Sequence, residues 1–231
     1  MKIIPCPSPN FDERADNQKP SMIIIHYTGT QTADEARDIF VSPVAVGEYG
    51  RVSPHYMIGE HAEIYNFVDE DKRAWHAGRA SWGDCTDINS ASIGIEIWNT
   101  GHEYNLEDFI PEQIDALIAL INDIRTRWDI HDKNILGHSD VAPGRKLDPG
   151  EKFPWAKLAK SGIGMMPKIS KEIKSDSDVF FDKLQSYGYT YTDDNQILLT
   201  EFRRHFLPHL LNLKNVTDDD IQAIDYLINQ G

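Results

Sequence analysis

A continuous apolar run, MIIIHY at residues 22–27, limits the fold more than any other segment of the chain. Such a run suits a strand that is buried on both faces, and it ends in His26 beside a Thr-Gly-Thr turn. The stretch ASIGIEIWNTG at 91–101 alternates instead, so its isoleucines share one face while Glu96 lies on the other. Both patterns predict strands of a sheet that is covered by other elements.

Helical patterns accompany these strands. The apolar stripe of PEQIDALIALINDIRTRW predicts a helix from Pro111 to about residue 128, and a shorter helix is expected over 32–41. Strand-like pieces at 54–58 and 63–68, joined by GEHA, predict a hairpin. Strands mixed with helices at these lengths predict an α/β fold, with a mixed central β-sheet flanked by helices.

The character of the chain changes after about residue 162. The segment GIGMMPKISKEIKSDSD begins with glycine and proline and continues with charged and small residues, which is typical of a linker. Three helices are expected beyond it, over about 175–188, 195–207 and 216–229, with N-caps at Ser175, Asp194 and Thr217. We therefore expect one domain over 1–167 and a small C-terminal three-helix domain over 168–231.

Composition excludes several classes of partner. The formal net charge of −14 over 231 residues disfavours nucleic acid and anionic membrane surfaces. No stretch reaches the roughly 18 consecutive apolar residues of a membrane span. The two cysteines, Cys6 and Cys85, give no disulfide framework and favour a reducing compartment. The N-terminus lacks the apolar run of a signal peptide, so we expect a cytoplasmic protein.

The loop GHSDVAPGRKLDPG at 137–150 gathers charged side chains between glycines and prolines. Prolines stiffen such a loop, and stiff loops commonly hold side chains in place for a site. His138 and Asp148 of this loop, together with His26, form a donor set that is normal for catalytic zinc, which keeps a fourth position open. The alternative is that the two histidines are ordinary surface or core residues, since nine histidines occur in the chain and no HExxH motif supports a metal.

Three charged residues are candidates for acid–base and electrostatic roles. Glu96 is costly to bury without a partner, so it is either an outward charge on an edge strand or a general base. Arg145 and Lys146 either balance the charge of Asp148 or stabilise a developing oxyanion. We favour Lys146, because in extended backbone it would face the same side as Asp148, two residues away.

The segment RAWHAGRASW at 73–82 places aromatic side chains beside glycine, which suits a groove wall for sugar rings or peptide. The alternative is that its tryptophans are ordinary core residues. Four residues are our candidates for substrate binding, namely Arg51, Trp75, His76 and Asn89.

Five motifs occur in order over roughly residues 5–165: IIIHYTG, VSPHYMI, RAWHAGRASWG, NSASIGIEIWN and GHSDVAPGRKLDPG followed by FPW. Together they resemble the zinc-dependent N-acetylmuramoyl-L-alanine amidases of the type 2 amidase family, which share their fold with peptidoglycan recognition proteins. The resemblance implies one zinc ion per chain, with His26, His138 and Asp148 as ligands. It also implies that Glu96 is the general base and that Lys146 is the cation that stabilises the transition state.

The implied reaction is hydrolysis of the amide between N-acetylmuramic acid, including its 1,6-anhydro form, and L-alanine of peptidoglycan stem peptides. The implied partners are therefore muramoyl peptides, met in cell-wall turnover and recycling in bacteria. A non-catalytic peptidoglycan sensor and a phage-type lysin are alternatives. The complete ligand set favours an enzyme, and the acidic charge disfavours a lysin.

Two branches of the family fit different parts of the chain. The missing leader resembles the cytoplasmic recycling branch, whereas the three-helix tail resembles the periplasmic branch, whose C-terminal domain is like peptidoglycan-binding modules. We expect residues 1–167 to form the amidase domain and 168–231 a peptidoglycan-binding-like domain, in the cytoplasm, with the periplasm as the alternative. A structural cap or the surface of a homodimer is the alternative role for the tail.

Overall fold

A six-stranded mixed sheet forms the centre of the computed structural model, which describes residues 1–47, 50–169 and 179–230. The strand order is β1-β5-β4-β7-β3-β8, and β5 runs antiparallel to β4 whereas the other neighbours are parallel. This confirms the predicted fold class. The strands span β1 Ile3–Pro5, β3 Met22–Tyr27, β4 Tyr56–Ile58, β5 Ile64–Asn66, β7 Ser92–Ile97 and β8 Ile135–Gly137, and a second sheet pairs β2 Phe11–Glu13 with β6 Lys72–Ala74.

The isoleucines of the two central strands lie as the two patterns predict, on both faces of the sheet for the continuous run and on one face for the alternating stretch. Ile23 and Ile25 of β3 join Ile93, Ile95 and Ile97 of β7 in one cluster, which packs against helix α3. Met22 and Ile24 belong to a second cluster on the opposite face. His26 and Glu96 alternate with the residues of the first cluster, so both point to the face that α3 does not cover.

Eight α-helices are present in the described part of the chain. α3 begins at Pro111 as predicted but ends at Ile124, four residues early, because its last turn tightens into bonds from Thr126 to Asp123 and from Arg127 to Ile124. The predicted short helix is α1, which Thr32 caps through the backbone N–H of Glu35. The helices span α1 Ala33–Val41, α2 Ile88–Ala91, α3 Pro111–Ile124, α4 His138–Val141, α5 Trp155–Lys160, α6 Phe180–Tyr187, α7 Asn195–Phe206 and α8 Asp218–Gln230.

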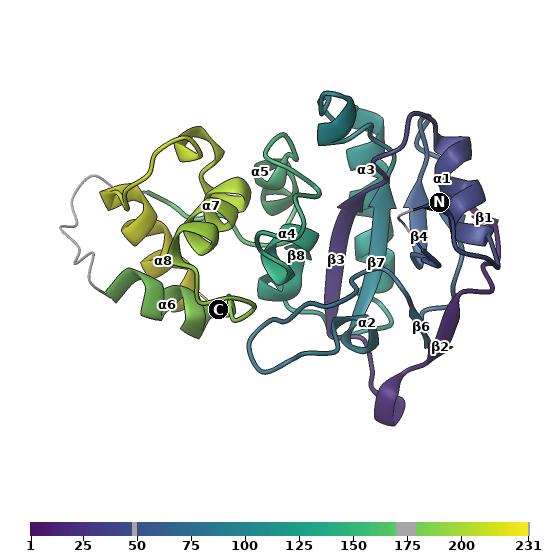
Figure 1. Ribbon diagram of the computed structural model, residues 1–231, viewed down its shortest axis with the longest axis horizontal. Helices are drawn as coiled ribbons and strands as arrows, with labels where there is room; N and C mark the ends of the chain where they lie inside the picture. The colour runs from purple at the N-terminus through teal and green to yellow at the C-terminus, as the bar shows by residue number, and fades with distance from the viewer. Residues whose placement is uncertain (48–49, 170–178, 231) are drawn as a thin grey trace.

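The C-terminal helices α6, α7 and α8 lie beyond β8 and α4, at the left of Figure 1. Asp194 caps α7 by accepting from two backbone N–H groups, and Thr217 accepts from that of Asp220 at the start of α8, as expected. The expected cap Ser175 and the first residues of its helix lie outside the described residues.

The hydrophobic cluster on this side crosses the expected domain boundary at residue 167. It contains Ile24 of β3 and Leu136 of β8 together with Phe180, Leu198 and Ile224 of the three terminal helices. The division into domains over 1–167 and 168–231 stays a prediction. What the structure shows is that the tail helices and the sheet share one packed core.

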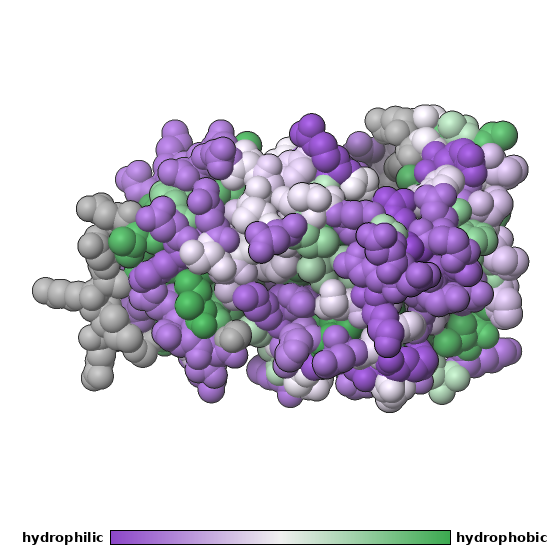
Figure 2. Space-filling view, turned by 90° about the horizontal axis from the view of Figure 1, so that it is seen from below, coloured by the Kyte–Doolittle hydropathy of each residue, from purple (hydrophilic) through white to green (hydrophobic). Residues whose placement is uncertain are grey.

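The surface in Figure 2 is largely hydrophilic, and its apolar side chains form separate small areas among the described residues. Cys6 and Cys85 are both free thiols, as the sequence predicts. None of the helices that the structure describes is long and apolar enough to cross a bilayer.

Candidate metal centre and active-site cleft

Three buried side chains from distant parts of the chain meet at one point. His26 ends β3, His138 opens α4 directly after β8, and Asp148 lies in the stiff loop that follows α4. Nδ1 of His26, Nδ1 of His138 and Oδ2 of Asp148 lie 2.9–3.0 Å from one another. Each residue is at most 7% exposed.

The other ring nitrogen of each histidine has its own partner. Nε2 of His138 faces the carbonyl oxygen of Ala77 at 3.0 Å, so it carries a proton and donates it. Nε2 of His26 lies 3.0 Å from Nδ1 of His76, whose Nε2 lies 3.2 Å from the hydroxyl of Ser92. These contacts leave Nδ1 of both rings free to present lone pairs to a metal, as in known metal sites.

The donor set fits zinc. Ligand atoms about 2.0–2.1 Å from a tetrahedral zinc ion stand roughly 3.4 Å apart, so the three atoms need to open only slightly around an ion. Burial, and after it the charge of His138, lowers the pKa of His26 to about 4, so the ring is neutral at pH 7. Burial raises the pKa of Asp148, but the charges and hydrogen bonds of His138 and His26 outweigh burial and hold this pKa below the usual range. Neutral imidazoles and an ionised carboxylate are the protonation states that a metal requires.

Glu96 extends into the same cleft from β7. This strand lies between β4 and β3, so Glu96 is not on an edge strand. Its Oε2 is buried and has no hydrogen-bond partner among the described residues. Burial and the nearby charge of Asp148 raise its pKa well above the usual value. A carboxylate of this kind is suited to proton transfer near neutral pH.

Lys146 lines the cleft beside Asp148. Within the described ranges, no hydrogen bond or ion pair engages its ammonium group. It reaches the cleft from a helical turn in which its N–H bonds the carbonyl of Ala142, and not from the extended backbone that we expected. Its positive charge lowers the pKa of both His26 and Glu96.

All nine predicted site residues line one cleft of about 700 Å³, namely His26, Arg51, Trp75, His76, Asn89, Glu96, His138, Lys146 and Asp148. The guanidinium of Arg51 lies over the Trp75 ring, 4.8 Å from its centroid, and the two form part of the wall. The indole N–H of Trp75 donates to Asp12 at 2.8 Å, which fixes the ring.

Two of the predicted substrate-binding residues make contacts that hold the site together. Oδ1 of Asn89 accepts from the backbone N–H groups of His76 and Ala77, at 3.2 and 2.8 Å. His76 in turn contacts His26. Asn89 therefore fixes the loop that carries both the His76 ring and the Ala77 carbonyl, on which the two metal-site histidines depend.

Sequence reasoning missed three residues at this cleft. Arg145, which we set aside in favour of Lys146, donates to the Ala77 carbonyl at 2.6 Å and lines the cleft as well. The hydroxyl of Tyr27 lies 2.9 Å from Nδ1 of His102, whose Nε2 contacts Glu151 at 3.1 Å. Arg145 and Tyr27 adjoin predicted site residues in the sequence, which is the only signal that could have found them.

Comparison with known proteins agrees with this geometry. Residues 16–151 match the family described as N-acetylmuramoyl-L-alanine amidase. AmiD of Escherichia coli K12, an N-acetylmuramoyl-L-alanine amidase, is 34% identical over 88% of this chain and 80% of its own length. AmpD of Citrobacter freundii, a 1,6-anhydro-N-acetylmuramyl-L-alanine amidase, is 34% identical over 66% of this chain and 86% of its own.

Solved structures extend the likeness to the tail. AmiD from E. coli, in complex with anhydro-N-acetylmuramic acid-L-Ala-D-γ-Glu-L-Lys, superposes with a TM-score of 0.77 at 30% identity, over 94% of this chain and 92% of that one. AmpDH3 from Pseudomonas aeruginosa gives 0.76 at 30% identity, over 91% and 92%. Since the family match spans more than half of the residues and these relatives cover most of the fold, the chain belongs to the N-acetylmuramoyl-L-alanine amidase family, the type 2 amidases.

Proposed function

We propose that this amidase hydrolyses the bond between N-acetylmuramic acid and L-alanine of peptidoglycan stem peptides, with one zinc ion at His26, His138 and Asp148. The observation that supports this most directly is the convergence of the three ligand atoms beside an unpartnered carboxylate oxygen of Glu96. A metal-dependent amidase needs both a metal centre and a proton acceptor, whereas a sensor needs neither.

The residues of the cleft divide the chemistry among them. A bound zinc ion supplies a Lewis acid that polarises the amide carbonyl and makes water more acidic. Glu96 accepts a proton from the attacking water and delivers it to the departing amino group of L-alanine. Lys146 places an unpaired positive charge where the carbonyl oxygen becomes negative. His76 and the Ala77 carbonyl hold the two imidazoles in orientation.

The substrate class follows from the cleft and from the relatives. AmiD is solved with an anhydromuramoyl tripeptide and AmpDH3 with an anhydromuramic pentapeptide. We infer that this chain takes 1,6-anhydro-muramoyl peptides as well. Arg51 and Trp75 supply a flat cationic wall, which suits the sugar ring and the carboxylates of the stem peptide.

Three further points stay predictions. We expect a cytoplasmic location, with the periplasm as the alternative, and cell fractionation tests it. We expect residues 168–231 to form a peptidoglycan-binding-like domain next to an amidase domain over 1–167. The alternative is that the tail forms the surface of a homodimer, and a measurement of the protein's mass in solution tests it.

Peptide release from purified substrate tests the proposed function. The chain loaded with one equivalent of zinc should release tripeptide from anhydro-muramoyl tripeptide, and a chelator should abolish the release. Binding of the fragment without release would support the sensor instead. Release from intact sacculi but not from the fragment would support a lysin.

A further inference from the structure

A buried carboxylate next to the metal centre is held by the C-terminal helices. Asp140, in α4, is 1% exposed. Its Oδ1 accepts from the hydroxyl of Tyr189 at 2.6 Å, and its Oδ2 lies 2.7 Å from Nδ1 of His205 in α7. A ring nitrogen at this distance from a carboxylate carries the proton, so His205 donates as well.

The same carboxylate also accepts a hydrogen bond from the backbone beside His138, a proposed metal ligand. Oδ2 of Asp140 accepts from the N–H of Gly137 at 2.7 Å, directly before His138. On the other side of His138, the N–H of Ser139 donates to the carbonyl of Asp148 at 2.9 Å, which ties the segments of the two proposed ligands together. Whatever fixes Asp140 therefore fixes the backbone on both sides of the His138 ring.

Helix α7 contacts the metal-binding loop at two further points. Ile197 lies so close to Gly144 that a Cβ there would come within 2.9 Å of it, and Gly144 has a φ of +77°. Arg204 forms an ion pair with Glu151, three residues after Asp148. With Asp140, these contacts lie at the start, the middle and the end of the loop that carries His138, Lys146 and Asp148.

The two donors are themselves rigid. His205 is stacked between Trp155 and Phe206, with ring centroids 3.8 and 3.9 Å apart. Tyr189 is fully buried and packs edge-on against Trp82, with centroids 5.0 Å apart. Neither ring can leave Asp140 without disturbing the core that the tail shares with the sheet.

We propose that Tyr189 and His205 are positioning residues, which act through Asp140 to hold His138 for metal binding, so the C-terminal helices form part of the metal centre's support. This rests on the proposed zinc site. It gives the tail a role in the amidase reaction that does not depend on binding glycan. Outer partners of metal ligands commonly change metal affinity by about 10- to 100-fold when removed.

Two conservative variants test this in the full-length chain. Tyr189→Phe deletes one hydroxyl and keeps the ring, and His205→Phe keeps the stack and removes the donor. Competition with a chromophoric chelator should show zinc affinity lower by about tenfold in each. Hydrogen exchange in the metal-free protein should be faster at the amides of Gly137 and Ser139.

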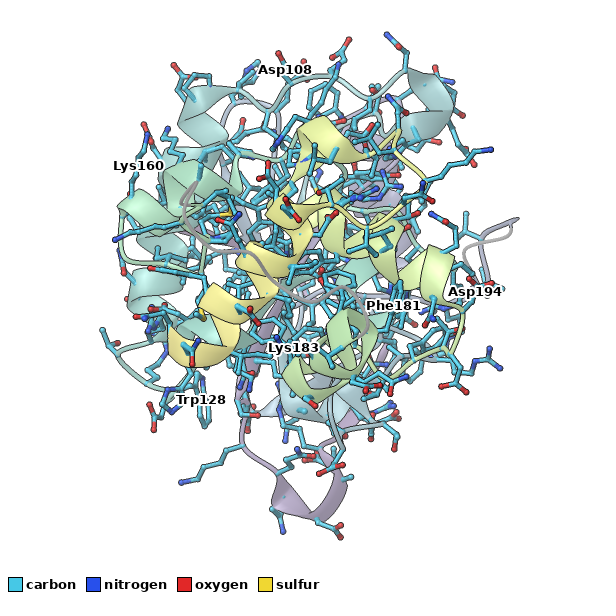
Figure 3. The ribbon with its side chains drawn as sticks, turned by 90° about the vertical axis from the view of Figure 1, so that its left-hand side faces the viewer. Asp108, Trp128, Lys160, Phe181, Lys183 and Asp194 are labelled. Atoms are coloured by element: carbon cyan, nitrogen blue, oxygen red, sulfur yellow. The ribbon has the colours of Figure 1, made fainter. Side chains whose placement is uncertain are left out.

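The control is Lys183→Met, which breaks the 2.5 Å ion pair between Lys183 of α6 and Asp225 of α8. Lys183 lies on the tail helices that face the viewer in Figure 3. This variant should lower the melting temperature and leave both zinc affinity and exchange at 137–139 unchanged. Unchanged affinity and exchange in Tyr189→Phe and His205→Phe would overturn the proposal. If the unaltered chain binds no zinc, the proposed function fails instead, and the exchange measurement still decides the role of the two residues.

Discussion

Glu96 and His26 are register partners on the neighbouring parallel strands β7 and β3, so their side chains leave the sheet on the same face. One end of the sheet therefore carries both a proposed metal ligand and the proposed base, on rigid backbone. Sites on strands hold their geometry more precisely than sites on loops. The loop residues Lys146 and Asp148 are added to this fixed pair.

Replacing the proposed base tests its role directly. Glu96→Gln keeps the shape of the side chain but removes the proton acceptor, so kcat should fall by about 10²- to 10⁴-fold. Zinc content should stay at one ion per chain, because Glu96 is not a ligand. Metal analysis and peptide release on the same sample measure both quantities.

Glu107→Gln is the matched control, since Glu107 is an exposed carboxylate outside the cleft. It should leave kcat unchanged. A Glu96→Gln variant that retains most of its activity would remove Glu96 from the mechanism.

The pH profile should depend on the raised pKa of Glu96. Burial and then the charge of Asp148 raise this pKa well above its ordinary value of 4.5, whereas Lys146 lowers it. A base must be ionised, so kcat should fall as the pH drops through the raised value. Lys146→Met removes the charge that lowers the pKa, so its acidic limb should shift to higher pH and its kcat should fall. An acidic limb that stays in place would contradict the electrostatic coupling between Lys146 and Glu96.

Acid should destabilise the metal-free protein through His55. Burial and then the charge of Arg14 lower the pKa of His55 from 6.5 to about 3. The unfolded state therefore binds a proton that the folded state does not, and stability falls by about 1.4 kcal/mol per unit as the pH drops from 6.5 towards 3. His55→Asn can still accept the Gly94 N–H, which now bonds Nδ1 at 3.0 Å, and should flatten the slope by one proton.

His131→Asn is the control, because His131 is exposed. Urea unfolding between pH 4 and 7 should give the same slope for this variant as for the unaltered chain. Equal slopes for His55→Asn and the unaltered chain would show that His55 is not held neutral.

The sequence predicts the parts of this molecule whose signal is local. The run at 22–27 predicts a strand that is buried on both faces, and the alternation around Glu96 predicts which residues share a face, because side chains in a strand alternate with a period of two. The stiff loop at 137–150 carries two of the three proposed ligands. Of these segments, His26, Glu96, His138 and Asp148 line the cleft.

Long-range contacts explain what was not predicted. Oδ1 of Asn89 accepts hydrogen bonds from backbone N–H groups 12 and 13 residues away, and nothing near Asn89 in the sequence indicates these contacts. Likewise, Asp140 meets Tyr189 and His205 only because the tail folds back onto the sheet. The sequence after residue 162 did not indicate that the apolar residues of the tail helices pack into the same core as the sheet, and the division into two domains stays a prediction.

Gly94 should not tolerate any side chain, because the His76 ring occupies the space that a Cβ at this position would need. A Cβ there would come 2.4 Å from Cγ of His76. Gly94→Ala should therefore destabilise the fold by roughly 1–3 kcal/mol and push His76 away from Nε2 of His26, which weakens zinc binding. The His76→Ala background removes the overlap, so Gly94→Ala should cost much less stability there. Melting curves of the two single variants and the double variant measure this coupling, and strictly additive losses would show that the His76 ring is not what excludes a side chain at Gly94.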